Sequence, residues 1–237
     1  MKAQEARELG RSVAALVGAG KGEEAYALLE PALASRTPFP KLEMVGDAVG
    51  AGPPGATVDY RIREDSFLDD LASHETEGGW VVIGAALRQR VKPDMAGAME
   101  RARGYIIAAD VWYGADILGD RVPGPALIAR FDPALALLAP WRQDGNRWVR
   151  RAMGVAAHFW AKRSRGDVTL APQASALLSF LEPMAGEETL DAAKGVGWGL
   201  KTMGRHYPDL VSAWLEDVLA AGKRRPRAAM LRKALAY

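Results

Sequence analysis

Arg151 lies beside the apolar stripe of a stretch, residues 146–163, whose pattern predicts a helix. Apolar residues recur there at three- and four-residue steps, which gives the helix one buried face. These positions are Val149, Ala152, Met153, Ala156, Ala157 and Trp160. An arginine this close to a packed surface usually holds an anion. The anion is either a carboxylate of the chain, in an ordinary salt bridge, or a ligand phosphate, and Arg151 alone leaves both open.

The elements that must position Arg151 are helices throughout the chain. Asn146 suits the N-cap of its helix, and the cations near residue 163 suit the negative end of the helix dipole. Gly- and Pro-rich breaks separate similar helical patterns, with almost no strand signal between them. We predict helices at residues 3–18, 23–34, 42–50, 64–73, 79–91, 94–108, 110–119, 124–130, 132–140, 146–163, 171–182, 187–204, 208–221 and 225–236.

This run of helix pairs with short loops is typical of an α-solenoid, whose HEAT and armadillo units repeat every ~40–47 residues. A faint internal echo supports this: residues 151–157 align with residues 194–200 at a shift of 43 residues. A further shift brings Trp112, Val155 and Trp198 to equivalent positions. The echo predicts that Trp112, Arg151 and Trp198 lie on comparable inner helices of one curved stack.

Asp116 completes a set of four residues. It follows Trp112 by four positions, so both occupy one face of the helix at 110–119. Taken singly, each tryptophan is most often a core residue, and Asp116 is most often a surface charge or half of a helix–helix salt bridge. The set gains meaning only from its order and spacing.

That order resembles the DNA alkylation repair family, the HEAT-like alkylpurine DNA glycosylases. The family carries Trp-x-x-x-Asp, then Trp-x-x-Arg-Ala about 35 residues later, then Lys-x-x-Gly-Trp-x-Leu followed by a basic residue. This chain has Trp112 to Asp116, Trp148 to Ala152 and Lys194 to Lys201, with 35 residues between Asp116 and Arg151, and a Tyr207-Pro208 turn. The resemblance runs from about residue 75 onward. Tyr113 stands where relatives often carry a second acidic residue.

The resemblance implies a chemistry. Asp116 would stabilise the oxocarbenium-like transition state of N-glycosidic cleavage or orient water, as a carboxylate does in glycoside hydrolysis. Trp112 and Trp198 would present aromatic faces to the deoxyribose and exclude water. Arg151 would hold a backbone phosphate. Arg150, Lys194 and Lys201 are the other expected DNA-binding residues.

Composition and charge are compatible with this activity. Residues 1–141 carry a net charge of −5 and residues 142–237 a net charge of +7, which suggests a polyanion on one face. Ordinary solvated helix surface gives the same asymmetry. The absence of cysteine excludes disulfides and cysteine-ligated metals, and suits a reducing cytoplasm. His74, His158 and His206 are too scattered for a metal site.

We therefore predict an all-α HEAT-like superhelix, residues 1–237, as a single curved domain with a basic concave face. The expected function is metal- and cofactor-independent excision of cationic alkylpurines, such as 3-methyladenine and 7-methylguanine, in base excision repair. We expect duplex DNA as partner, no membrane association, a monomer, and a cytoplasmic, nucleoid-associated location. The alternatives are a non-catalytic HEAT-repeat DNA-binding protein and an α-solenoid scaffold for protein interactions.

Overall fold

The computed structural model describes residues 1–220 and 226–236, and within them every regular element is a helix. The all-α helical-repeat architecture expected from the sequence is confirmed. The chain divides into two compact units, Met1–Ala109 and Asp110–Tyr237. The single curved domain with a concave basic face stays a prediction.

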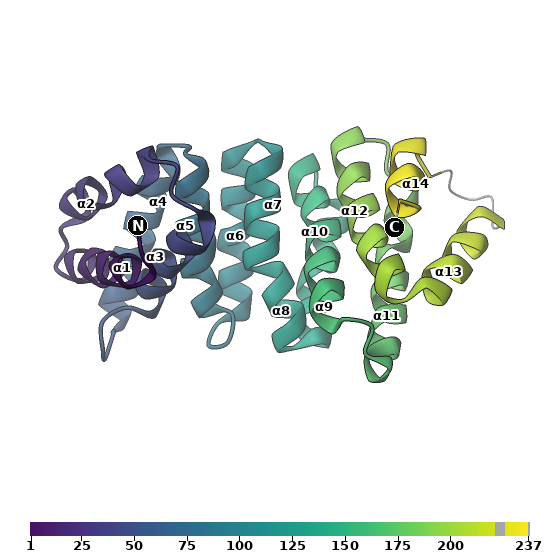
Figure 1. Ribbon diagram of the computed structural model, residues 1–237, viewed down its shortest axis with the longest axis horizontal. Coiled ribbons are helices and arrows are strands. Elements are labelled where there is room, and N and C mark those ends of the chain that lie inside the picture. Colours follow the sequence, from purple (N-terminus) through teal and green to yellow (C-terminus); the bar gives the residue numbers. More distant parts are fainter. Residues whose placement is uncertain (221–225, 237) are drawn as a thin grey trace. The chain divides into compact units, whose positions relative to one another are not determined.

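The first unit stacks its helices in two layers (Figure 1). Its helices are α1 (Ala3–Gly18), α2 (Gly22–Ala34), α3 (Phe39–Ala51), α4 (Val58–Ser73), α5 (Glu77–Arg90) and α6 (Met95–Ala109). One layer contains α1, α3 and α5, each packed on the next, and the other contains α2, α4 and α6. Gly46 and Gly50 of α3 lie directly against the α5 backbone, where any Cβ would clash. Small residues thus set the close spacing of the layer.

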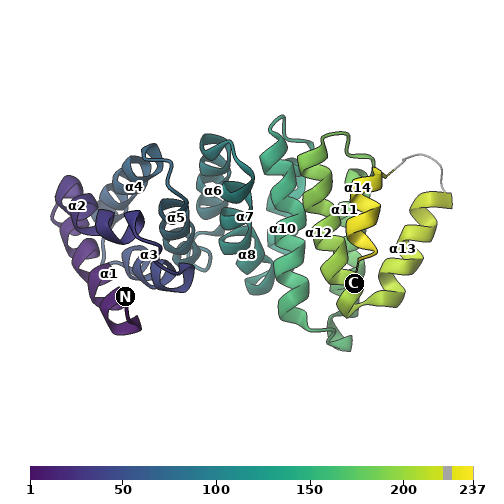
Figure 2. The same ribbon diagram turned by 45° about the horizontal axis from the view of Figure 1, so that its top comes forward.

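The second unit repeats this plan. Its helices are α7 (Trp112–Arg121), α8 (Pro123–Ala129), α9 (Phe131–Leu138), α10 (Arg147–Ser164), α11 (Ala171–Leu181), α12 (Leu190–His206), α13 (Pro208–Ala220) and α14 (Ala228–Ala234), with 3₁₀ turns η1 (Ala139–Gln143), η2 (Val168–Leu170) and η3 (Glu182–Gly186). Helices α7, α10, α12 and α14 follow one another in one layer, and α9, α11 and α13 form the other. Figure 2 shows α10 and α12 side by side.

Glycines bring the helices of this layer together. A Cβ on Gly195 would lie 2.6 Å from the carbonyl oxygen of Arg151, and one on Gly199 would lie 2.6 Å from that of Gly154. Gly197 points the other way, where a Cβ would lie 2.9 Å from the carbonyl oxygen of Met230 on α14. The alternating glycines of α12 therefore allow close packing on both sides of that helix.

The 43-residue echo is confirmed for the helices but not for the side chains. Trp112, Val155 and Trp198 lie on α7, α10 and α12, which are neighbours in one layer. Val155 is fully buried, whereas Trp112 is exposed and Trp198 is half-buried. Equivalent positions in the repeat therefore have different surroundings.

The largest boundary error is at α4, which begins at Val58 rather than at residue 64. Its first turns expose Val58 and Ile62, by 75% and 61%, while Glu64 is completely buried. Because apolar residues are exposed here and an acidic residue is buried, the apolar pattern does not show the helical period. Among the basic residues near the C-terminus, 223–225 lie outside the described residues.

Candidate functional site

Helix α10 carries Arg151 and begins as its sequence predicts. The Asn146 side chain accepts hydrogen bonds from the backbone N–H groups of Trp148 (2.8 Å) and Val149 (3.4 Å), which confirms the N-cap. The helix ends at Ser164, and the next residue, Arg165, has a left-handed φ of 52° and is followed by Gly166. The local sequence thus fixes both ends of α10.

Arg151 binds Asp116 across the interface between α10 and α7. Its Nε donates to Asp116 Oδ1 at 2.7 Å, and a terminal nitrogen donates to Oδ2 at 2.8 Å. Its other terminal nitrogen donates to the backbone carbonyl of Asp191 at 3.0 Å. The Arg151 side chain is 7% exposed and that of Asp116 is 17% exposed. The anion beside Arg151 in this structure is therefore a carboxylate, held in the two-point geometry typical of strong arginine pairs.

Asp110 and Trp148 fix the beginning of α7. The Trp148 indole donates to Asp110 Oδ1 at 2.7 Å, and Asp110 has a left-handed φ of 41°. Trp148 is buried, as expected for a core tryptophan. Sequence reasoning did not give Asp110 a role, although it directly precedes the Trp112 motif. This bond ties the first residues before α7 to α10, and so helps to place Asp116 opposite Arg151.

Trp112 lies one turn before Asp116 and is 55% exposed. Its ring meets Tyr113 edge-on, with the centroids 5.7 Å apart. A large aromatic side chain left this open can contact a ligand with more than half of its surface. Trp112 is therefore a surface aromatic residue on the helix that carries Asp116.

Trp198 stacks on His158, with ring centroids 4.1 Å apart and an interplanar angle of 26°. The Lys233 ammonium of α14 lies 6.0 Å from the Trp198 ring centroid. Burial lowers the pKa of Lys233, as do the positive charges of Arg151, Lys194 and Lys201, while Asp116 opposes them. Lys233 thus belongs with the predicted residues. The sequence gave little indication that Lys233 belongs to the site, because basic residues are common in the last turn of a helix.

The predicted DNA-binding cations differ in their availability. Each nitrogen of the Arg150 guanidinium is bound within the protein, to Glu187, Thr189 and the carbonyls of Asp144 and Gly145. Lys194 and Lys201 are half-buried, and no carboxylate of the described residues forms an ion pair with either. The two lysines are therefore better placed than Arg150 to contact an external anion.

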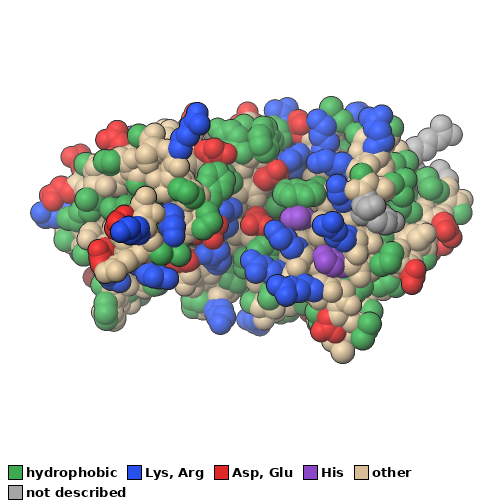
Figure 3. All heavy atoms as spheres, viewed as in Figure 1, with side chains coloured by type: hydrophobic (Ala, Val, Ile, Leu, Met, Phe, Trp, Pro, Cys, Tyr) green, Lys and Arg blue, Asp and Glu red, His purple; other side chains and the backbone are tan. Residues whose placement is uncertain are grey.

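The surface over α10 and α12 is basic. In Figure 3, Lys and Arg side chains gather around histidines over these two helices, whereas red and blue side chains mix over α1 to α5. Across residues 1–220 and 226–236, no group of three or more His, Asp or Glu side chains is arranged to hold a metal. None of the described helices is long and apolar enough to cross a membrane.

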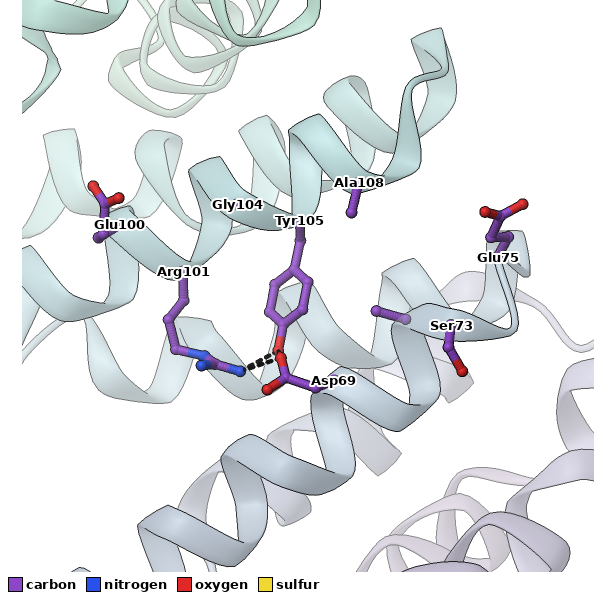
Figure 4. A pocket seen from close by; sticks show the side chains of 9 residues that line it. Asp69, Ser73, Glu75, Glu100, Arg101, Gly104, Tyr105 and Ala108 are labelled. Atoms are coloured by element: carbon purple, nitrogen blue, oxygen red, sulfur yellow. Dashed lines mark hydrogen bonds and ion pairs between the residues drawn. The ribbon is translucent and has the colours of Figure 1, made fainter.

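A separate pocket of about 530 Å³ lies in the first unit, between α4 and α6 (Figure 4). Its polar wall is occupied by internal bonds. Asp69 accepts from the Tyr105 hydroxyl at 2.7 Å and from Arg101 at 2.7 Å. This pocket lacks the paired tryptophans and lysines of the second unit.

One known family matches most of the chain. The sequence model of the family described as DNA alkylation repair enzyme matches residues 63–237, and the chain belongs to this family. The match includes Trp112, Asp116, Arg151 and Trp198. Searches of curated proteins and of solved structures returned no match. The family supports a role in the repair of alkylated DNA.

Proposed function

We propose that this protein is a DNA glycosylase that excises cationic N3- and N7-alkylated purines by hydrolysing the N-glycosidic bond. The observation that carries the proposal is the Asp116 carboxylate, fixed by Arg151 at two points and still partly exposed. Family membership supports the repair role, and the resemblance of the motifs supports this reaction.

Asp116 is suited to stabilise positive charge that develops on deoxyribose. Its two oxygens offer about four acceptor positions, and Arg151 uses one on each. The others remain for the sugar or for a water molecule. A fixed carboxylate needs little reorganisation as an oxocarbenium-like centre forms beside it. A purine already positive at N3 or N7 leaves readily, so no strong general acid is required.

Arg151 then acts mainly by positioning Asp116. Its guanidinium is nearly buried and also bonded to the Asp191 carbonyl. The sequence suggested a direct contact between Arg151 and a phosphate. Only those hydrogens of its terminal nitrogens that are not bonded to Asp116 or Asp191 could make this contact. Lys194, Lys201 and Lys233 supply the cations for the DNA backbone, since phosphate contacts provide most of the sequence-independent affinity. Trp112 and Trp198 contact the sugar and limit water.

The decisive experiment is Asp116→Asn. We expect release of 7-methylguanine from duplex DNA to slow by roughly 10²-fold or more, about 2.7 kcal/mol of barrier, because the charge acts in the transition state. Affinity for an uncharged abasic-site analogue should change much less. Circular dichroism melting corrects for any unfolded fraction.

The matched control is Asp209→Asn, which removes an exposed carboxylate of α13 and should leave excision unchanged. Chelators should have no effect on either protein. Native-rate excision by Asp116→Asn would disprove the mechanism. If the unmodified protein excises no cationic alkylpurine while it still binds DNA, the non-catalytic DNA-binding alternative takes its place.

A further inference from the structure

A second pocket has a volume of about 370 Å³, and its lining includes His158, the residue that stacks on Trp198. Helices α10 and α12 line it with one-turn pairs of polar side chains. These pairs are His158 with Lys162, Lys201 with Arg205, and Thr202 with His206. The volume is within the range of about 300–1,000 Å³ typical of ligand sites.

Three basic side chains line the pocket. Lys162 and Arg205 are exposed and Lys201 is half-buried. Among the residues that the structure describes, no carboxylate lines the pocket or forms an ion pair with these three cations. Like charges around one pocket repel each other unless an anion joins them. The arrangement is therefore poorly balanced when empty and favourable around a multivalent anion.

We propose that this pocket binds a phosphate ester, with Lys162, Lys201 and Arg205 as cationic ligands and His158 as a neighbouring donor. Three cations and two imidazoles fit the several oxygens of a phosphate better than the single charge of chloride. A DNA backbone diester and a small monoester share this chemistry. The site goes beyond the proposed glycosylase activity, because its occupancy can be measured without excision.

His158 connects the pocket to Trp198. Its Nδ1 lies 2.6 Å from Thr202 Oγ1, and the Thr202 hydroxyl donates to the Trp198 carbonyl at 3.3 Å. Either atom can be the donor in the contact between His158 Nδ1 and Thr202 Oγ1, according to the tautomer of the neutral ring. A protonated ring donates from both nitrogens at once, to Thr202 and to a phosphate. The resulting imidazolium would stack on Trp198 as a cation–π pair.

The protonation state of His158 should therefore report phosphate binding. Burial, and secondarily the Lys162 charge, lower the pKa of His158 to about 4. Lys201, Arg205 and His206 of α12 line the same pocket, and Lys233 of α14 lies over the Trp198 ring. A bound phosphate offsets these cations and favours the charged ring. Phosphate should raise the pKa of His158, and below the second pKa of phosphate, where the ligand stays a monoanion, its affinity should increase as pH falls toward the pKa of His158.

The test is an NMR titration of His158 with inorganic phosphate, against chloride at equal ionic strength. The chain has three histidines, and His158→Gln assigns the signal. We expect a saturable phosphate shift and a higher pKa. The variant Lys162→Gln/Arg205→Gln should weaken phosphate by about tenfold or more, which is about 1.4 kcal/mol. It leaves Asp116, Arg151 and both tryptophans intact.

The matched control is Arg130→Gln/Arg165→Gln, which removes two exposed cations of the same unit outside the pocket. It should bind phosphate like the unmodified protein. Displacement of phosphate by undamaged duplex DNA identifies the backbone as the source, and displacement by a mononucleotide alone identifies a small monoester. Absence of a saturable shift, or equal weakening by both double variants, overturns the proposal whether or not the protein excises bases.

Discussion

Both units contain arginines paired with carboxylates, but the residues around these ion pairs differ. In the first unit, completely buried Glu64 pairs with Arg61 and Arg90, and Asp65 pairs with Arg90 and Arg101. Burial raises the pKa of Glu64, against the lowering effect of Arg90 and Arg61. In the second unit, Arg151 pairs with Asp116 beside lysines that form no ion pair within the described residues and beside incompletely buried tryptophans.

The difference shows that a buried arginine is not diagnostic of a ligand. Ion-pair distances are short in both units, 2.6 to 2.8 Å at Arg90 and 2.7 Å at Arg151. The surrounding charge separates them. The first unit carries 13 basic and 16 acidic residues, whereas residues 110–237 carry 18 basic and 13 acidic residues. A balanced network serves the fold, and an excess of cations around one carboxylate favours a polyanion.

The largest contrast should come from two tryptophans. Trp80 in the first unit is 1% exposed, so Trp80→Ala should lower the free energy of unfolding by about 3–5 kcal/mol. Trp112 is 55% exposed, so Trp112→Ala should change it by only about 0.5 kcal/mol. It should nevertheless slow excision by about tenfold or more, or about 1.4 kcal/mol of barrier. Urea unfolding and single-turnover excision measure both. A strongly destabilised Trp112→Ala protein would refute the functional assignment.

A double-mutant cycle tests whether Arg151 acts through Asp116. Excision by Arg151→Ala/Asp116→Asn should match that of Asp116→Asn alone, while the stability changes should couple by about 0.5–3 kcal/mol. Additive losses in excision would instead give Arg151 an independent role, such as phosphate binding. The control cycle, Arg90→Ala with Asp65→Asn, should couple in stability and leave excision per folded molecule unchanged.

The smallest effect concerns single lysines. The logarithm of DNA affinity should fall linearly with the logarithm of salt concentration, and Lys194→Gln should reduce the slope by about one. Lys92→Gln, which removes an exposed cation of the first unit, should leave the slope unchanged. Fluorescence anisotropy with undamaged duplex measures both. A flat salt dependence of the unmodified protein would favour the protein-interaction scaffold.

Helix positions were largely predictable, because a helix depends on neighbours three and four residues away. The pattern around Asn146 gave the N-cap of α10, and the order of motifs placed Trp112 and Asp116 together on α7. Helix α4 was misjudged where this rule fails, since Arg61 and Arg90 compensate Glu64 in a position that an apolar residue usually takes. One of these two partners, Arg90, lies on another helix, α5.

The sequence by itself determined the helices, their order and the chemistry that their side chains offer. Only the tertiary structure decided that Arg151 meets a carboxylate 35 residues away, that Arg150 is bound internally, and that Lys233 joins the lysines of α12. The reason is physical. Helix formation follows local spacing, whereas the partner of a charge depends on which helix faces pack together and how closely. Here the close packing depends on glycines such as Gly154 and Gly195, whose small size matters only once α10 and α12 are in contact.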